Sequence, residues 1–147
     1  MVTRFRAYLL GTEGSSVSYF ANRRFTVIEG RLNVCNRKTL LSEMEICGVT
    51  HANDLDVTNW DADHCAGSEL EALLGLVRPS RIHCPGYVPH TVNGDTCLAI
   101  IEAYRHEMRF SNRGASVRQI TPAFIANLDH ARDLAFQETY DSTLADI

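Results

Sequence analysis

The chain has 147 residues, of which 45% are hydrophobic, and it carries a formal net charge of −4 with a pI near 5.8. This length is enough for one compact domain with a real core, and the hydrophobic fraction excludes a disordered chain. The mildly acidic balance gives no global signature of nucleic-acid binding, although metals or a local basic patch would still hold phosphates. No apolar run approaches the roughly 18 residues of a membrane span and no signal peptide is recognisable, so no membrane partner is expected.

Three short strands are predicted at the start of the chain. Apolar runs at 5–10, 17–20 and 25–28 are separated by polar turns, and the first turn contains two glycines that permit positive φ. Short strands joined by tight turns predict an antiparallel meander.

The rest of the chain alternates helical and strand patterns. Apolar residues at helical spacing and helix-end signals predict helices over 37–46, 66–77 and 93–104, and from Pro122 onward. Short apolar runs predict strands over 54–58, 80–84 and 117–120. We expect Ser68 or a neighbour to cap the second helix, and Thr121 to cap the last one. This order predicts an α/β domain over 1–140, with a mixed sheet covered by helices, and a polar tail over 141–147.

The five cysteines are expected to be reduced thiols in a cytosolic protein. Their number is odd, and no pair has the two-residue spacing of a zinc knuckle. Most are interpreted as small buried hydrophobic residues. Cys65 is singled out because it directly follows His64.

The segment from His51 to His64 concentrates the residues that bind metals. It holds two histidines and four aspartates; Asp61, Asp63 and His64 are strong ligand types, and Asn59 offers a weaker carbonyl oxygen. Because close carboxylates repel one another, either the segment is a solvated loop or a cation neutralises it. Mixed nitrogen and oxygen ligands suit zinc, manganese or iron better than calcium.

These candidate ligands follow a predicted strand and precede a predicted helix. That places them at the carboxyl end of a strand, where α/β proteins keep their sites. Outside this group, His51 and Asp54 are interpreted first as loop residues and second as groups that support the ligands. His90 lies on a polar loop from which it could reach a substrate, whereas His83 is interpreted as a core histidine. Surface positions are expected for His106 and His130.

The pattern Asn59-x-Asp61-x-Asp63-His64 resembles the His-x-His-x-Asp-His signature of the metallo-β-lactamase superfamily. It is closest to the His-x-Asp-x-Asp-His variant of the competence-protein-like (DNA uptake) branch, with Asn59 standing where the family has its first histidine. Upstream, the glycine turn at 10–15 and the pair Glu29-Gly30 resemble, in the same order, a glycine turn and an acidic residue–glycine pair of those relatives.

The resemblance implies the first half of an αββα sandwich. The second half has no counterpart before Ile147, so a second segment or chain is expected to complete the fold. It also implies a metal half-site of Asn59, Asp61, Asp63 and His64 that holds zinc or manganese, as one or two ions. Asp63 is the implied catalytic residue, which orients a metal-activated water, and the implied substrate is a phosphodiester in nucleic acid.

Three further interpretations remain open, and Asn59 is interpreted equally as a turn residue or as a ligand. The chain could be a binding or assembly module that keeps the fold with a degraded metal site and docks on a partner; Asn59 in place of histidine and the missing second half favour this. Alternatively, the acidic loop could hold one structural cation without chemistry, or Asp63 could simply cap the following helix.

Overall fold

A mixed sheet of six strands forms the centre of the computed structural model, which describes residues 2–126. The strands are β1 (Arg4–Ala7), β2 (Val17–Ala21), β3 (Arg24–Ile28), β4 (Asp54–Asp56), β5 (Arg81–Pro85) and β6 (Ser116–Ile120). They lie in chain order: β1 to β3 are antiparallel, and from β3 to β6 each strand is parallel to the next. The predicted α/β class is confirmed at this level, as a meander that continues into a parallel sheet.

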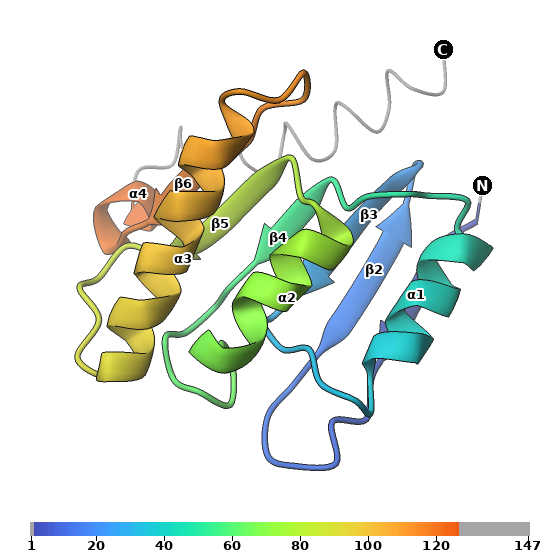
Figure 1. Cartoon of the computed structure of the whole chain (residues 1–147), viewed down its shortest axis with the longest axis horizontal. Coiled ribbons are helices and arrows are strands. Elements are labelled where there is room, and N and C mark those ends of the chain that lie inside the picture. Colours follow the sequence, from blue (N-terminus) through green and yellow to red (C-terminus); the bar gives the residue numbers. More distant parts are fainter. Residues whose placement is uncertain (1, 127–147) are drawn as a thin grey trace.

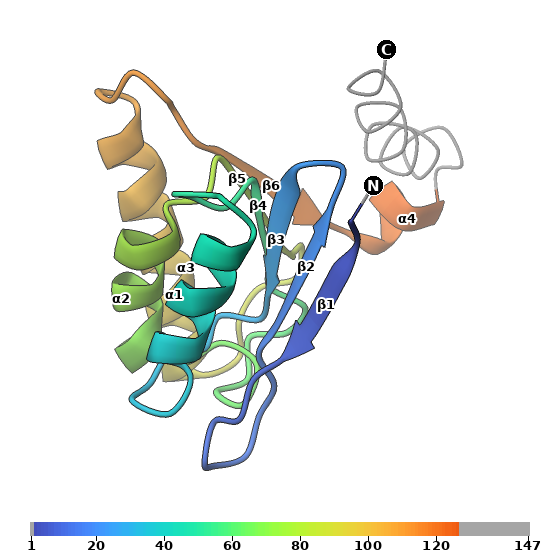
Figure 2. The same ribbon diagram turned by 90° about the vertical axis from the view of Figure 1, so that its right-hand side faces the viewer.

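Three helices cover one face of the sheet. They are α1 (Arg37–Ile46), α2 (Gly67–Val77) and α3 (Val92–Met108), and each connects two parallel strands. Because parallel crossovers are right-handed and the strand order advances in one direction, all three fall on the same side, as Figures 1 and 2 show. The short α4 (Pro122–Ala126) lies on the other side (Figure 2). Among the described residues, no helix has the combination of length and apolar character that a bilayer span requires.

The core lies between the sheet and these helices. The strand register aligns Val27 with Leu55 and Leu55 with Ile82, so their side chains form one row, and none of them is exposed. From α2, the buried residues at helical spacing that complete this layer are Leu70, Leu73, Leu74 and Val77. Burial of each such side chain contributes about 2 kcal/mol. This packing fixes where the carboxyl ends of the parallel strands lie.

The alternate strand residues form the second face of the sheet, which α1 to α3 leave uncovered. Here Phe5 of β1 and Tyr19 of β2 are 69% and 42% exposed. On β4, by contrast, the buried Asp54 forms ion pairs with Arg24 and Arg81. Burial would raise the pKa of Asp54, but hydrogen bonds from Arg81 and Arg24 together hold that pKa below its usual range. The second face is therefore apolar over β1 and β2 and charged over β4 and β5.

The start of α2 differs from the prediction. The helix begins at Gly67 after Ala66, and no side chain of its own segment caps it, neither Ser68 nor Asp63. Instead the Gly67 N–H donates to Oδ1 of Asn93, at the start of α3, over 3.0 Å. A cap supplied by another helix leaves no signal in the local sequence.

The starts of α3 and α4 follow local chemistry. At α3, Oγ1 of Thr91 accepts a hydrogen bond from the Gly94 N–H (3.1 Å), so the helix begins slightly before the predicted position. At α4, the predicted Thr121 cap is confirmed, because its Oγ1 accepts from the Phe124 N–H at 2.9 Å. The predicted continuation of this helix, His130 and the tail at 141–147 lie outside the described residues.

Glu43 of α1 is a buried carboxylate between the helix and the edge strand β1. Its side chain is 2% exposed and accepts hydrogen bonds from Arg4 (2.6 Å) and Arg6 (2.9 Å). The hydrogen bond from Arg4, followed by that from Arg6, lowers the pKa of Glu43 to about 2, although burial opposes the change. This cluster ties α1 to β1 across the sheet edge.

Replacing Glu43 with glutamine is expected to lower the free energy of unfolding by about 2 kcal/mol at pH 7, because hydrogen bonds to a charged group are weakened. The folded pKa is depressed, so the contribution is present above the usual pKa of 4.5 and is lost as the pH falls through about 2. Urea unfolding across this range should show wild type and Glu43→Gln converging at low pH. Glu45→Gln, on the exposed side of α1, is the matched control, and an equal loss there would contradict this assignment.

Candidate functional site

The candidate site lies at the carboxyl ends of β3 and β4, of which the sequence predicts only the second. Glu29 and Gly30 directly follow β3, while Thr58 and the loop to Ala66 follow β4. Gly30 pairs with Cys65 in an isolated parallel bridge, and its N–H donates to the carbonyl of His64 at 2.8 Å. A side chain at Gly30 would meet Sγ of Cys65 at 2.6 Å, so only glycine allows this approach. The ends of the two strands are thereby held together.

Glu29 is the residue that organises this site. It is buried (5% exposed) and has a left-handed backbone, with φ of 75°. Its carboxylate accepts hydrogen bonds from Oγ1 of Thr58 and from the Thr58 N–H at 3.2 Å, and it lies 3.0 Å from Nδ1 of His64. The predicted ligand set did not include Glu29; its only sequence signal is the acidic residue–glycine pair after the third strand.

His64 is oriented by that carboxylate. Its Nδ1 faces Glu29, and its Nε2 lies 3.6 Å from Oδ2 of Asp63, with the His64 side chain 34% exposed. The hydrogen bond to Glu29 raises the pKa of His64 above its usual 6.5, helped by the charges of Glu29, Asp63 and Asp61 and opposed by burial. The imidazole therefore presents Nε2 to the loop of Asp63.

The Asn59 side chain stabilises the loop. Its Oδ1 accepts hydrogen bonds from the Asp61 N–H and from the hydroxyl of Tyr87, both at 3.0 Å. Next to it, the indole N–H of the buried Trp60 donates to the Tyr87 carbonyl at 3.1 Å. Asn59 thus acts as a turn residue that joins this loop to the one after β5.

The loop that carries Asp63 is docked on the first glycine turn. The carbonyl of Asp63 accepts from the Ser15 N–H (3.1 Å) and from Arg31 (3.2 Å). Gly14 makes this contact feasible: its φ is +123°, and a side chain there would lie 2.3 Å from the Asp63 carbonyl oxygen. Arg31 is itself paired with Glu69 of α2 at 2.8 Å. The carboxylate of Asp63 is exposed, as is that of Asp61.

The structure brings together two of the four predicted ligands, Asp63 and His64. In the described part of the chain, the Asp61 carboxylate forms no hydrogen bond or ion pair with either side chain, although its charge helps to raise the His64 pKa. The Asn59 oxygen already accepts two hydrogen bonds. Within residues 2–126, no three histidine, cysteine, aspartate or glutamate side chains form a group that could hold a metal ion. The described residues therefore provide a pair of donors and a supporting carboxylate.

The remaining predicted site residues are dispersed. Asp54 is held by its two arginines, and the half-buried His51 precedes β4 at the opposite end of the strand. His90 is exposed on the loop after β5 and stacks on Tyr87, with ring centroids 6.3 Å apart and planes at 17°. Of the three, His90 is the one near the site, since Tyr87 contacts Asn59 directly.

Of the remaining histidines, His83 is buried and His106 is exposed, as expected, whereas His130 lies outside the described residues. His83 is 7% exposed and lies on the second face of the sheet, where its Nδ1 is 2.7 Å from Oδ1 of Asp56. Its Nε2 is buried and has no hydrogen-bond partner among the described residues. His106 is exposed and packs edge-on against Phe110.

The cysteines are unpaired, and three of them are fully buried: Cys65, Cys84 and Cys97. A hydrogen bond with Cys97, together with burial, raises the pKa of the Cys65 thiol. Its position next to His64 does not make Cys65 a reactive thiolate, because a nucleophilic cysteine needs a lowered pKa and access.

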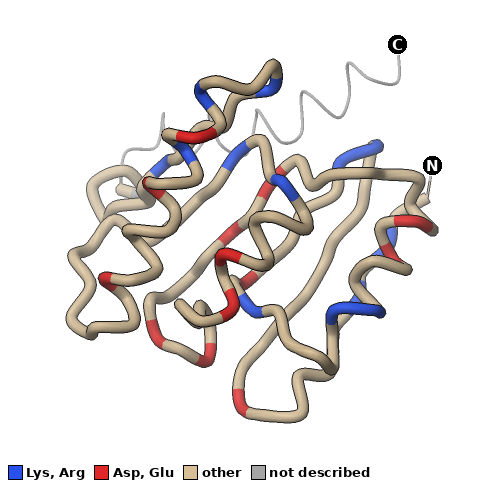
Figure 3. Tube along the Cα trace, viewed as in Figure 1, with Lys and Arg blue, Asp and Glu red and all other residues tan. Residues whose placement is uncertain are grey.

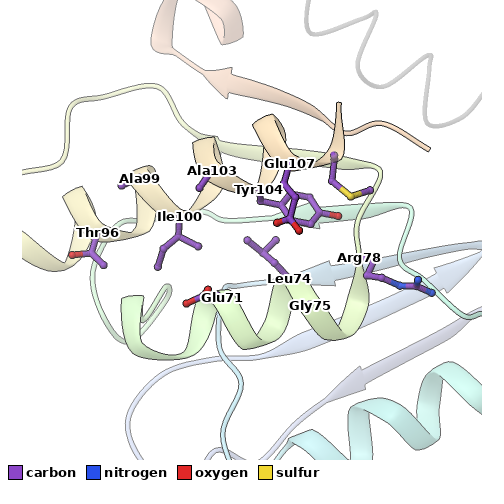
Figure 4. Close-up of a pocket in the computed structure, with 11 residues that line it drawn as sticks. Glu71, Leu74, Gly75, Arg78, Thr96, Ala99, Ile100, Ala103, Tyr104 and Glu107 are labelled. Atoms are coloured by element: carbon purple, nitrogen blue, oxygen red, sulfur yellow. The ribbon is translucent and has the colours of Figure 1, made fainter. Parts of the chain in front are cut away.

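A separate groove of about 750 Å³ lies between α2 and α3 (Figure 4). Its floor is apolar, with Leu74 and Ile100 between the helices, and Glu71, Glu107 and Arg78 stand around it. The groove shares no residue with the candidate site.

Neither a protein-family model nor a curated protein matches this chain.

In metal-free protein, Glu29→Gln is expected to lower the pKa of His64 and to destabilise the fold in a pH-dependent way. The folded pKa is raised, so the contribution of the Glu29–His64 pair is present below the usual pKa of 6.5 and is lost as the pH rises through the raised value. NMR titration of the His64 ring signals checks the shift, and unfolding at several pH values checks the stability. Glu13→Gln, an exposed change in the neighbouring turn, should leave both unaltered. An unchanged His64 pKa in Glu29→Gln would contradict the pairing.

Proposed function

We propose that the loop from Thr58 to His64 is half of a hydrolase site that activates water with a divalent cation. The orientation of the His64 ring is the observation that supports this proposal: Nδ1 is held by Glu29, and Nε2 points at Asp63. Histidines that bind metals characteristically donate their other ring N–H to a carboxylate, which fixes the tautomer and the direction of the free nitrogen. Glu29 supplies that carboxylate here.

The spacing of the two donors fits a shared ion. Ligands bound tetrahedrally at about 2.0–2.2 Å lie roughly 3.3–3.6 Å from one another, and Nε2 of His64 lies 3.6 Å from Oδ2 of Asp63. Zinc or manganese suits one nitrogen and one carboxylate oxygen. When bound, such an ion supplies hydroxide at neutral pH by lowering the pKa of its water. Asp63 would hold the ion and orient that water, while Asp61 is close enough in sequence to join after a small loop movement.

The substrate is proposed to be a phosphodiester in nucleic acid, on the resemblance of the motif. The acidic charge of the site loops restricts how such a substrate can bind. The loops at the site carry Glu13, Asp61 and Asp63, all exposed, and Figure 3 shows red segments on these loops. Acidic loops repel a phosphate, so a phosphodiester can approach only when cations occupy the site. Binding of substrate is therefore expected to depend strictly on metal.

Metal content is the first test. Protein purified without chelator and supplied with zinc or manganese is expected to retain an ion, and the double variant Asp63→Ala, His64→Ala is expected to lose it. Glu29→Gln should weaken binding by about 10–100-fold, because it removes the group behind the histidine. Elemental analysis and competition with a chromophoric chelator measure both effects.

Asp95→Ala, an exposed acidic change in the first turn of α3, is the control and should bind as wild type. Retention of metal by the double variant would place the ion elsewhere, and absence of metal from wild type at saturating zinc would remove the hydrolase proposal for this chain. Hydrolysis of bis(4-nitrophenyl) phosphate, assayed with and without metal, then tests the chemistry separately from binding.

A second candidate function is an assembly module whose partner completes the sandwich. The part of the second face over β1 and β2 favours it, because Phe5 and Tyr19 are exposed there, whereas α1 to α3 cover the other face of the sheet. The structural use of Asn59 also favours it, since a full metal position would need that oxygen.

For this candidate, Phe5→Ser together with Tyr19→Ser is expected to leave the melting temperature nearly unchanged while reducing self-association or partner binding. Loss of exposed apolar area costs little in the isolated chain but removes much of the attraction to a covering layer. Sedimentation velocity at several concentrations, with and without a candidate partner, measures this. Leu41→Ser, an exposed residue of α1 on the helical side, serves as the control, and an equal effect there would argue against the second face.

A further inference from the structure

The end of the sheet opposite the candidate site is basic. It is formed by the connections that lead into β4, β5 and β6, and each contributes one cationic or titratable side chain: His51, Arg78 and Arg113. In Figure 3 several blue segments lie at this end, and red segments lie on the loops at the opposite end. The chain has 14 lysines and arginines against 18 aspartates and glutamates, so this concentration runs against its overall charge.

Arg78 and Arg113 lie directly beside each other. One guanidinium nitrogen of Arg113 donates to the carbonyl of Arg78 (3.1 Å) and to Oγ of Ser80 (3.2 Å). The guanidinium of Arg78 donates to the carbonyl of Thr50 at 3.3 Å, next to His51. These contacts hold both side chains in place but leave most of their N–H donors unused.

No carboxylate among the described residues forms an ion pair with Arg78 or Arg113, although Glu71 and Glu107 line the same groove as Arg78. Arg24, Arg81 and Arg105 differ in this respect. Arg24 and Arg81 share Asp54, and Arg105 pairs with Glu102 at 2.6 Å. The contacts of Arg78 and Arg113, by comparison, are all to carbonyl and hydroxyl oxygens. Adjacent like charges without a counter-ion repel each other, and a bound anion removes that cost.

The backbone conformation of Arg78 is also unfavourable for a residue with a side chain. Arg78 ends α2 with φ of 43°, in the left-handed region where glycine is favoured. In Figure 4 its side chain extends away from the apolar floor of the α2–α3 groove. The side chain is therefore directed towards the end of the sheet rather than into the groove.

The pKa of His51 responds to the electrostatic potential at this end of the sheet. Burial first, and then the charges of Arg113 and Arg78, lower the pKa of His51 below its usual 6.5. A histidine placed beside an acidic group shows the opposite change. After burial, the charges of the two arginines therefore act on His51 in the direction expected of nearby cations.

We propose that Arg78, Arg113 and His51 form a phosphate-binding site at the amino ends of β4 to β6. The site is separate from the loop of Asp63, and it stands whether or not the hydrolase proposal does. Two guanidinium groups offer paired N–H donors that match the oxygens of a phosphate, and the imidazole adds a third donor from another loop. The ligand class is a phosphate group, whether free or at the end of a nucleic-acid strand.

Titration with inorganic phosphate at constant ionic strength tests the site, with the His51 ring signals followed by NMR. Wild type is expected to show a saturable shift with Kd of about 1–10 mM. Arg113→Gln keeps a donor for the Arg78 carbonyl but removes the charge, and it should weaken binding at least about ten-fold. Arg78→Ala, on a different loop, should do the same. Arg37→Ala, an exposed cation at the start of α1, is the matched control and should bind as wild type.

A 5′-phosphorylated oligothymidylate and its unphosphorylated form distinguish the two sources of phosphate. Tighter binding of the phosphorylated strand than of inorganic phosphate assigns the site to strand ends, whereas equal affinities assign it to small phosphates. The proposal is overturned if wild type shows no saturable shift by about 50 mM phosphate, or if Arg37→Ala weakens binding as much as Arg113→Gln.

Discussion

The end of β3 holds the site together through one residue, Glu29. Its left-handed backbone turns the chain so that Gly30 can pair with Cys65, and its buried carboxylate binds both Thr58 and His64. A buried carboxylate is costly unless it is fully bonded, so Thr58 and His64 are required to satisfy it. The same bonds fix the loop after β4. The direction of His64, and with it the relation of His64 to Asp63, follows from satisfying Glu29.

This constraint separates the candidate metal ligands of the motif from the residue that only shapes its loop. Asp63 and His64 keep donor atoms that can still bind an ion. The Asn59 Oδ1, by contrast, already accepts hydrogen bonds from the Asp61 N–H and the Tyr87 hydroxyl. A half-site of two donors is consistent both with an ion completed by further ligands and with a fold kept for assembly. The two ends of the sheet also differ in charge: the loops of the candidate site carry exposed carboxylates, whereas Arg78 and Arg113 lie together at the opposite end.

Much of the fold could be predicted from the chain because it depends on local patterns. Alternation and turn residues place the strands, and apolar spacing places α2, whose end at Val77 the structure confirms. Failures occur where a distant residue substitutes for a local one, as at Gly67, which is capped by Asn93 of another helix. The same holds for the candidate site. The loop and its position after a strand could be predicted from the sequence. Glu29 could not be assigned to the site, because it lies 35 residues from His64 and its only sequence signal is a glutamate–glycine pair.

The sequence by itself determined the α/β order of elements, the position of the acidic loop after a strand, and the residue types that bind metal. These depend on periodicity and on chemistry within a few residues. Only the tertiary structure decided that Asn59 is a turn residue, that Asp54 belongs to Arg24 and Arg81, and that Arg78 lies against Arg113. Each of these depends on which strands are neighbours and in what register. That arrangement is set by packing of the whole core, and a local pattern does not record it.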